Sequence, residues 1–553
     1  MRCRFWGGAF FLLMVLPALS AQSPPCLETV WSLHFGGGED DIANQIIETS
    51  DGHFVVVGQS KSSDGDLSGN SGEEDFWVLK LDTLGQVVWQ RNYGGPGSDK
   101  AGSVAETPAG DYLVAGSSLS VGGDVGNNYG EEDAWLVKLS PDGQILWEKN
   151  YGGSANENIE EVRVAQDGGI LLIGYSESND GDVGGNNGDF DFWMVKLDAD
   201  GNLVWSHHYG GSAADWGYRV RETQSGELVV AGSTFSSNGD VSDNKGFYDF
   251  WVFKTDAGGN MLWERNFGGI TEERAYALEL AENEDIIVAG TSISGDGDVG
   301  GNNGGNDAWF IRLSPDGDLL WSRNYGGIQE DRSFSIAPTL DGGFVSAGIS
   351  RSSNADVANN YGAKDGWIVK LDANGNLEWE KNYGGTNEDR LFEIRQTRNR
   401  GFIACGFSFS DDIDLPGNNG GRDFWVLKLS PDSVGIDLGP DTTLCLGQTL
   451  LLRTGLDDSF DFLWQDGATD STFLVVEEGL YHVRASRNGC EVADTIFVDY
   501  VDQESVQLGA DTTLCEGQSV TLSSPLDGAH YLWQNGDTSP TLTASQPGIY
   551  WLE

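Results

Sequence analysis

The sequence predicts an all-β protein: a seven-bladed β-propeller followed by small β-sandwich domains. The first observation is a segment with two tryptophans that returns at a constant step of 58 residues, without insertion. Its two series are Trp77, Trp135, Trp193, Trp251, Trp309, Trp367 and Trp425, and Trp31, Trp89, Trp147, Trp205, Trp263, Trp321 and Trp379. A fixed period of this length indicates one supersecondary unit copied seven times.

The second observation is the strand content of each copy. The second copy has four runs of strand character, at 101–108, 112–118, 133–139 and 144–150. Short turns rich in Gly, Asp and Pro join the first run to the second and the third to the fourth, as in hairpins. Four antiparallel strands repeated seven times are typical of a β-propeller. A solenoid of stacked repeats is the alternative.

The lengths of the connections set the phase of the repeat. The NYGG-containing link is long enough to pass from the outer strand of one sheet to the inner strand of the next, whereas the SPDG turn is not. The array then begins with a fourth strand, Cys26–Phe35, and ends with a third strand at 423–429. We therefore expect the first strand to close the last sheet, within a propeller spanning 26–434. The NYGG links and the long loops between second and third strands share one face, where we expect function.

A different pattern starts near residue 435. The motif DLGPDTTLCLGQ at 437–448 recurs as QLGADTTLCEGQ at 507–518, and each copy has a central Trp. This predicts two small β-sandwiches, at 435–503 and 504–553, the second of them truncated. In an exported protein we expect Cys445 and Cys490 to form a disulfide.

Composition and the N-terminus indicate the compartment. Residues 1–21 read as a secretory signal: basic residues, an apolar run, then small residues. A net charge of −54 argues against nucleic acid as a partner. No later stretch is long and apolar enough to span a membrane. We expect an exported, monomeric protein, secreted or held at the cell surface.

The repeat pattern V-K-L-D-x-x-G-x-x-x-W, followed by YGG and DGG, resembles secreted bacterial β-propeller repeats of about 60 residues. Part of it resembles the blades of quinoprotein-type propellers, but no quinone or metal site of those enzymes can be matched. The DTTLC, LWQDG and GLY segments resemble immunoglobulin-like or PKD-like domains of Bacteroidetes surface proteins. That resemblance implies type IX secretion.

One candidate ligand site lies where the repeat varies. Each link between sheets carries an acid, and the residue after it changes from copy to copy. In four consecutive copies that residue is Trp216, Arg274, Arg332 and Arg390. An aromatic ring beside three guanidinium groups predicts a cradle for an acidic sugar. The alternative is that each Arg neutralises an acid next to it.

A second candidate is a calcium site in the loops between second and third strands. These loops carry an Asp-x-Asp pair, glycines and a nearby Asn, which supply oxygen ligands. The candidate ligands are Asp64, Asp66, Asp180, Asp182, Asn186, Asp296 and Asp298. The alternative is that these side chains hydrogen-bond their own loops.

No motif for nucleophilic, metal or phosphate chemistry is present, and none of the six His residues repeats. We therefore expect a non-catalytic binding or adhesion protein whose propeller recognises a polysaccharide or a surface protein. The alternative is an extracellular polysaccharide-degrading enzyme, a lyase or glycosidase, on the same scaffold.

Overall fold

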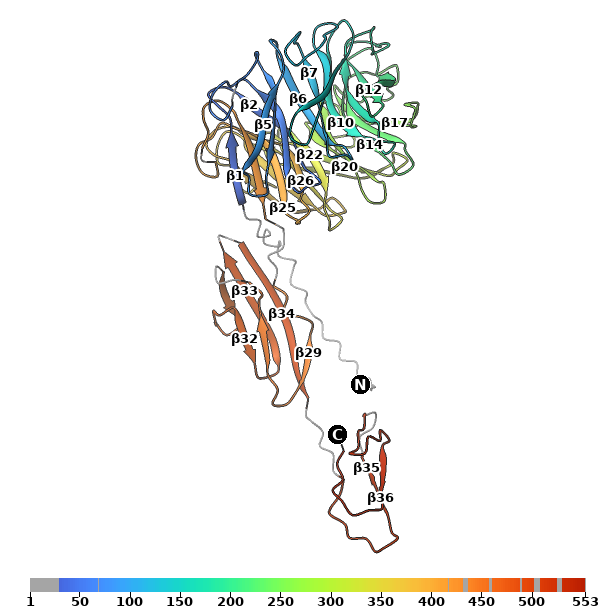
Figure 1. Cartoon of the computed structure of the whole chain (residues 1–553), viewed down its shortest axis with the longest axis vertical. Helices are drawn as coiled ribbons and strands as arrows, with labels where there is room; N and C mark the ends of the chain where they lie inside the picture. Colours follow the sequence, from blue (N-terminus) through green and yellow to red (C-terminus); the bar gives the residue numbers. More distant parts are fainter. Residues whose placement is uncertain are drawn as a thin grey trace. The chain divides into compact units, whose positions relative to one another are not determined.

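The computed structural model describes residues 29–552, except 68, 416, 431–435, 457–459, 488–489, 502–507 and 525–529. The described residues form strands and no helices, so no helix among them crosses a membrane. The chain divides into a unit at Pro24–Ser433 and a unit at Val434–Glu553, which are described separately (Figure 1).

The first unit consists of seven four-stranded antiparallel sheets. The first three are β2 (Asp41–Glu48), β3 (Phe54–Ser60), β4 (Asp75–Leu81) and β5 (Val87–Tyr93); β6 (Asp99–Glu106), β7 (Tyr112–Ser118), β8 (Asp133–Leu139) and β9 (Ile145–Tyr151); and β10 (Glu157–Val164), β11 (Ile170–Ser176), β12 (Asp191–Leu197) and β13 (Leu203–Tyr209). The next three are β14 (Asp215–Glu222), β15 (Leu228–Thr234), β16 (Asp249–Thr255) and β17 (Met261–Phe267); β18 (Glu273–Leu280), β19 (Ile286–Ser292), β20 (Asp307–Leu313) and β21 (Leu319–Tyr325); and β22 (Asp331–Pro338), β23 (Phe344–Ser350), β24 (Asp365–Leu371) and β25 (Leu377–Tyr383). The seventh sheet is β26 (Asp389–Gln396), β27 (Phe402–Ser408), β28 (Asp423–Leu429) and β1 (Thr29–Phe35).

The seventh sheet joins the two ends of the array, as predicted from the phase of the repeat. The strand β1 pairs antiparallel with β28, with Ser32 opposite Leu427 and Phe35 opposite Phe424. In the second copy the observed strands match the prediction within two residues. The first strand starts earlier than expected because the acid Asp99 already pairs with Ser118 of β7.

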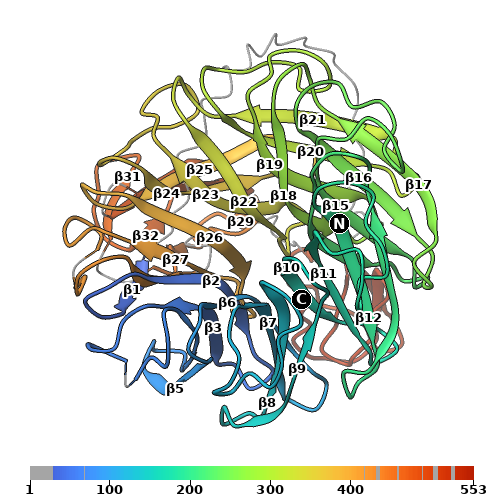
Figure 2. The same ribbon diagram turned by 90° about the horizontal axis from the view of Figure 1, so that it is seen from above.

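The seven sheets close into a ring. The first strand of every sheet contacts the first strands of both neighbouring sheets, and β26 contacts β2. In Figure 2 the strands β2, β6, β10, β18, β22 and β26 gather around the centre of this ring. The unit is therefore a β-propeller, with one sheet per repeat, and the solenoid alternative is excluded by the contact between β26 and β2.

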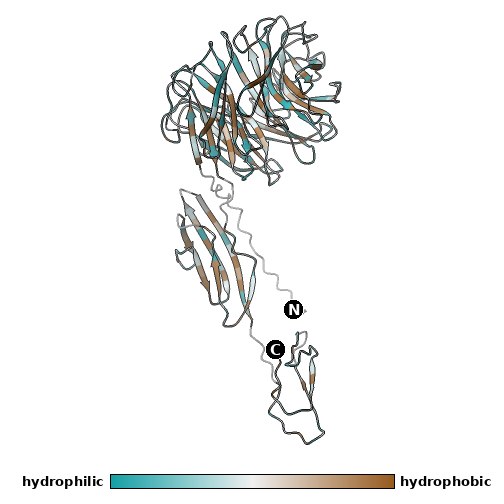
Figure 3. Cartoon of the chain, viewed as in Figure 1, coloured by the Kyte–Doolittle hydropathy of each residue, from teal (hydrophilic) through white to brown (hydrophobic). Residues whose placement is uncertain are grey.

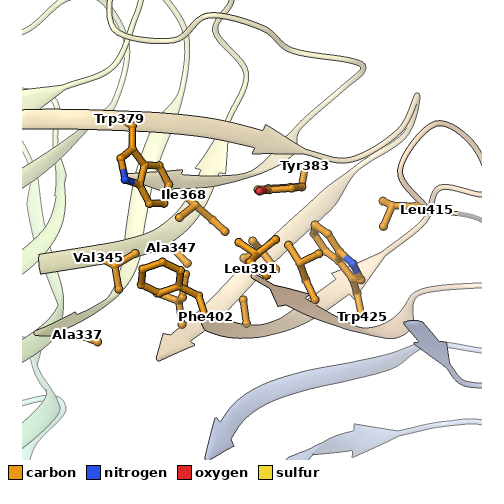
Figure 4. Close-up of a cluster of buried hydrophobic side chains, with 14 residues drawn as sticks. Ala337, Val345, Ala347, Ile368, Trp379, Tyr383, Leu391, Phe402, Leu415 and Trp425 are labelled. Carbon is orange, nitrogen blue, oxygen red and sulfur yellow. The ribbon is translucent and has the colours of Figure 1, made fainter. Parts of the chain in front are cut away.

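The tryptophans hold neighbouring sheets together. The third-strand series, such as Trp77 and Trp193, is fully buried, whereas most of the fourth-strand series is partly exposed. Figure 4 shows one cluster between sheets, where Trp379 and Phe402 approach each other and Trp425 lies beside Leu391. Large buried aromatic rings contribute much of the apolar area that stabilises such an interface. Apolar and polar residues alternate along many of the strands (Figure 3).

The second unit contains a two-sheet core. One sheet has the order β29 (Thr442–Cys445), β34 (Cys490–Val501), β33 (Gly479–Arg487) and β31 (Asp461–Trp464); the other pairs β30 (Leu450–Arg453) with β32 (Thr472–Val475). The core between them contains Phe462, Trp464, Val475, Val483 and Ile496. Further along the chain, β35 (Val520–Ser523) pairs with β36 (Thr541–Ala544), and Trp533 is buried.

The predicted disulfide between Cys445 and Cys490 is wrong. Cys445 is a free thiol, and its register places it beside Val501, at one end of β34. Cys490 begins that strand and pairs with Arg487 at the opposite end. Eleven steps along an extended strand span about 36 Å, whereas the Cα atoms of a disulfide lie within about 7 Å. The sequence pattern did not show that β29 would pair parallel to the far end of β34.

Candidate functional site

The first strands of the seven sheets share an irregularity that shapes the centre of the ring. In each of them the register with the second strand shifts between the third and the fifth residue, so the fourth residue has no partner. These fourth residues are Asn44, Gly102, Glu160, Tyr218, Tyr276, Phe334 and Phe392, and all seven line one cavity of about 440 Å³. The bulge therefore turns one residue per repeat into the cavity.

The cavity lies toward the face that carries the long loops. Gln59, Ser117 and Tyr175 also line it, each one residue before the end of a second strand, where the long loop begins. The face predicted from the connection lengths is therefore the face where the cavity lies.

Four consecutive sheets supply an aromatic arc. Tyr218 packs edge-on against Tyr276 with ring centroids 5.5 Å apart, and Tyr276 packs against Phe334 at 5.4 Å. Phe334 continues to Phe392, also at 5.4 Å. Because each ring holds the next one, the arc is a preformed apolar wall that a ligand can contact without ordering it.

The other three sheets supply a polar arc. Asn44 donates hydrogen bonds from Nδ2 to Gln59 Oε1 at 2.7 Å and to the Ala101 carbonyl at 2.8 Å. Glu160 accepts one from Asn158 at 3.0 Å. Burial raises the pKa of Glu160, and the nearby Arg219 opposes that shift.

The cavity wall is close to neutral. Its charged residues are Lys100, Arg219, Glu132 and Glu160, two of each sign. Glu132 accepts a hydrogen bond from Ser117 at 2.6 Å, and the Arg219 guanidinium donates to the Glu160 carbonyl at 3.3 Å. One side of the cavity is thus aromatic and the other offers donors and acceptors with balanced charge.

Farther along the same strands, an ion-pair network packs inside the ring. Arg221 donates two hydrogen bonds to Glu161, at 2.8 and 2.9 Å, and two to Glu279, both at 2.8 Å. Arg395 reaches Glu279 at 2.9 Å and Glu393 at 2.8 Å. Surrounding Arg groups hold the pKa of Glu279 well below its usual range despite burial. The network lies toward the short turns, beyond the fourth residues that line the cavity.

The structure brings two of the four predicted cradle residues together. Trp216 is stacked on Tyr248, with centroids 5.2 Å apart and planes at 19°. The Arg274 guanidinium lies 4.6 Å from the Trp216 ring centroid and 4.0 Å from that of Tyr248. Phe235 also stacks against Tyr248, with ring centroids 5.1 Å apart. These residues form an aromatic rim, and Tyr175, 6.5 Å from Trp216, connects it to the cavity.

The three predicted guanidinium groups do not form a shared anion site. Arg274 pairs with Glu272, Arg332 pairs with Glu330 at 2.8 Å, and Arg390 donates to Glu388 at 2.6 Å. In each case the partner is the glutamate two residues earlier in the chain. That glutamate directly precedes the acid that starts the first strand. The geometry corresponds to the alternative interpretation, in which each Arg neutralises an adjacent carboxylate. Retention of an acidic sugar by these residues stays a prediction.

The predicted calcium ligands hydrogen-bond the backbone of the adjoining link. Asp64 Oδ1 accepts from the Gly38 amide at 2.8 Å, and Asp66 Oδ2 accepts from the Gly36 amide at 3.1 Å. Asp180, Asp182, Asp296 and Asp298 accept from backbone amides in the same way. Asn186 donates to the Ser176 carbonyl at 2.8 Å. These contacts explain why the residues repeat, because they tie each long loop to a link.

In the part of the chain that the structure describes, no group of three or more His, Cys, Asp or Glu side chains is placed so that it could hold a metal ion. Calcium binding by the seven predicted ligands therefore stays a prediction.

Sequence reasoning missed the ring of fourth residues. It selected the second residue of each first strand, because that residue varies between copies directly after a repeated Asp or Glu. The informative position is the fourth residue of each first strand, two residues further along the chain. Four consecutive copies carry an aromatic residue there and the other three do not. Without the bulge, alternation alone does not show that this position faces the centre.

A search of protein-family profiles finds no match to this chain. It is 27% identical over 210 residues to the regulatory protein FlaEY of Caulobacter vibrioides, a match that covers 35% of this chain and 22% of that protein. Among solved structures, it is similar to the WD40 domain of Neurospora crassa Pan2, with 9% identity, a TM-score of 0.40, and coverage of 74% of this chain and 97% of that one. It is also similar to the PQQ-bound aldose sugar dehydrogenase of Streptomyces coelicolor, with 11% identity, a TM-score of 0.32, and coverage of 74% and 100%.

Proposed function

We propose that this chain is a non-catalytic binding protein, a seven-bladed β-propeller that holds one neutral glycan end at the mouth of its central channel. The single observation that carries this proposal is the ring of fourth residues, where an aromatic arc faces a polar arc. Sugars present apolar ring faces and polar hydroxyl edges, so they need both kinds of wall. A cavity of about 440 Å³ lies in the range of small-ligand sites.

A neutral ligand fits this site better than an acidic one. The charges of the cavity wall balance, and the guanidinium groups near its mouth are paired with glutamates. The proposal therefore gives each chain one binding site. A fully symmetric adhesive surface would instead offer seven equal sites, one per repeat.

The setting of this site is part of the proposal. The apolar N-terminal run supports export to the medium or the cell surface. The two-sheet core after residue 435 and the resemblance of its motifs support immunoglobulin-like or PKD-like spacers, of the kind that type IX-secreted Bacteroidetes proteins carry. In this arrangement the spacers display the propeller, which acts as a monomer.

The test is retention and calorimetric titration on a panel of neutral and acidic polysaccharides. Replacing Tyr276 by Ala removes the middle of the aromatic arc and should weaken binding by up to about tenfold, since an aromatic contact contributes about 0.5–1.5 kcal/mol. The matched control is Phe497→Ala, an exposed aromatic residue of the second unit. Binding that is unchanged in Tyr276→Ala and Phe334→Ala contradicts the proposed site.

Arg332→Ala tests the ligand's charge. It should leave binding of neutral glycans within about twofold, because Arg332 does not line the cavity and is paired with Glu330. Selective loss of acidic polysaccharide in this variant would favour the acidic-sugar cradle instead.

One observation favours the enzyme alternative: two carboxyl groups, Glu132 and Glu160, line the same cavity, and the pKa of Glu160 is raised. A glycosidase uses such a pair, with the raised group as general acid. Release of reducing sugars from a bound polysaccharide, abolished in Glu160→Gln while retention persists, would establish that activity in place of simple binding.

A further inference from the structure

The aromatic rim beside the cavity extends one ring further, to Phe247. Phe235 stacks on Phe247 with ring centroids 6.0 Å apart and planes at 13°, and it stacks on Tyr248 with planes at 30°. Tyr248 contacts Trp216, and Trp216 contacts Tyr175 in the cavity wall. A continuous series of ring contacts therefore leads from the cavity out over the face that carries the long loops.

Only the fourth sheet builds this rim. Its four rings, Trp216, Phe235, Phe247 and Tyr248, occupy fixed positions of the 58-residue repeat, and no other copy carries an aromatic residue at more than one of these positions. At the position of Phe247 the other six copies have Glu73, Glu131, Asp189, Gly305, Ala363 and Gly421. The other sheets form without an aromatic ring there, so the architecture of the propeller does not require one.

The outer part of the rim is open to solvent. Phe235 is 41% exposed and Phe247 is 60% exposed. The nearby Ile270 and Ile293 are 68% and 43% exposed, and the link that contains Ile270 accepts a hydrogen bond from the Phe247 amide through the Thr271 carbonyl at 2.8 Å. The rim is therefore a surface that a ligand in the cavity can reach without displacing any part of the chain.

The exposed area favours a sugar over a protein partner. The four exposed side chains together amount to about two whole side chains of apolar surface, which is at most about 500 Å². A stable protein interface takes about 800 Å² from each partner. A sugar ring needs only the area of one aromatic ring to cover its apolar face, so the rim has the size for one or two sugar units.

The ion-pair network decides which part of a chain can enter the cavity. Glu279 of the fifth sheet contacts Arg395 of the seventh sheet at 2.9 Å and Arg163 of the third sheet at 3.7 Å. Side chains from sheets that are not neighbours therefore meet across the channel below the cavity and obstruct it. A polymer cannot thread through, so its end enters the cavity and its remainder leaves through the mouth, where the rim lies.

We propose that the rim is a second sugar subsite, so that the ligand is a linear neutral glycan chain whose terminal unit enters the cavity and whose next units lie on Phe235 and Phe247. This inference rests on the proposed glycan function and adds the form of the ligand, a chain rather than a free monosaccharide. The stacked rings hold one another in place, so they lose little freedom when a sugar covers them. Arg274 at the inner end of the rim is paired with Glu272, which matches a neutral chain.

The experiment is calorimetric titration of the full chain with neutral sugars of increasing length. The probes are cellulose, xylan and mannan oligosaccharides, each from the monosaccharide to the hexasaccharide. In a series that binds, we expect affinity to rise about two- to tenfold once the chain is long enough to reach the rim, the gain from an aromatic contact. Longer members of the series should bind no more tightly.

The variants separate the rim from the cavity. Phe247→Ala should lower the ratio of hexasaccharide to monosaccharide affinity about two- to tenfold, whereas Tyr276→Ala should weaken binding of both lengths alike. Phe235→Ala is a second rim variant, and the melting temperature of each variant reports whether it folds. The matched control is Tyr361→Ala, an exposed aromatic residue in the long loop of the sixth sheet that lies outside the cavity lining; it should leave both affinities unchanged.

Two kinds of failure are distinguishable. Equal affinity for the monosaccharide and the hexasaccharide, or an unchanged affinity ratio in both rim variants, overturns the second subsite and leaves the proposed cavity function standing. Absence of binding to every series contradicts the glycan function and the rim inference together. Dimerisation of the wild type in sedimentation experiments that is lost in Phe247→Ala would assign the rim to a second copy of the chain and also overturns the sugar subsite.

Discussion

The sheet junctions and the channel mouth are built from the same seven strands, yet one repeats and the other does not. The first residue of these strands is always an acid, and it is fully buried in every sheet. The fourth residue ranges from Gly102 to Tyr276 and lines the cavity. Residues that tie one sheet to the next are constrained equally in every copy, whereas residues at the bulge have no pairing partner on the second strand and differ between copies. Asymmetry in a repeat protein therefore marks the position available to a ligand.

Replacing Arg221 by Met would break this comparison most strongly, because the residue at this channel position varies between copies and yet Arg221 is structural. The change leaves Glu161 and Glu279 buried without their shared partner. Removing one member of a buried ion pair costs about 3–5 kcal/mol of unfolding free energy. Urea denaturation measures it. The control Arg265→Met, on the exposed surface of β17, should stay within about 0.5 kcal/mol. An equally small effect for Arg221 would mean that the network does not support the fold.

Gly210→Ala tests the repeating junction. The added methyl group would lie 2.4 Å from Asp191 and 2.6 Å from Asp215. We expect a loss of about 1–3 kcal/mol, the usual cost of overpacking a tight site. Thermal and urea unfolding would measure it, and Gly94→Ala should give a similar loss at another junction. Gly295→Ala is the control, because nothing lies within 4 Å of its Cβ position. Equal stability of Gly210→Ala and Gly295→Ala would contradict the crowding of the junction.

The smallest expected effect is a pH dependence of ligand affinity through Glu160 in the channel. Burial raises the pKa of Glu160, so its carboxyl group keeps its proton to a higher pH than an ordinary glutamate. In the proposed glycan complex, a protonated Glu160 donates a hydrogen bond to a sugar hydroxyl, and that bond is lost as pH rises through the raised pKa. Affinity should therefore fall by up to about tenfold on going from acidic to alkaline pH, equivalent to about 1.4 kcal/mol.

Glu160→Gln keeps a donor but cannot ionise, so its binding should not depend on pH over the same range. Calorimetric titration at several pH values compares the two proteins. Binding by the wild type that strengthens as pH rises would show that Glu160 acts as an acceptor instead.

The sequence by itself determined the number of repeats, the strands within each copy and the closure by β1. These features depend on a period and on side-chain alternation, which are local properties that a chain displays directly. The same reasoning selected the face of the long loops as the one for function, which is the face toward which the cavity lies, because connection lengths alone decide which ends of the strands those loops join.

Tertiary structure alone decided which residues meet. The bulge after Ala275 turns Tyr276 into the channel, and the pairing of β29 with the far end of β34 separates Cys445 from Cys490. The partner of Arg274 is Glu272, not the acid that the repeat makes conspicuous. Such contacts depend on register shifts of one residue and on strands from different parts of the chain. A one-residue shift reverses the side of the sheet on which every later side chain lies, and no periodicity in the sequence records it.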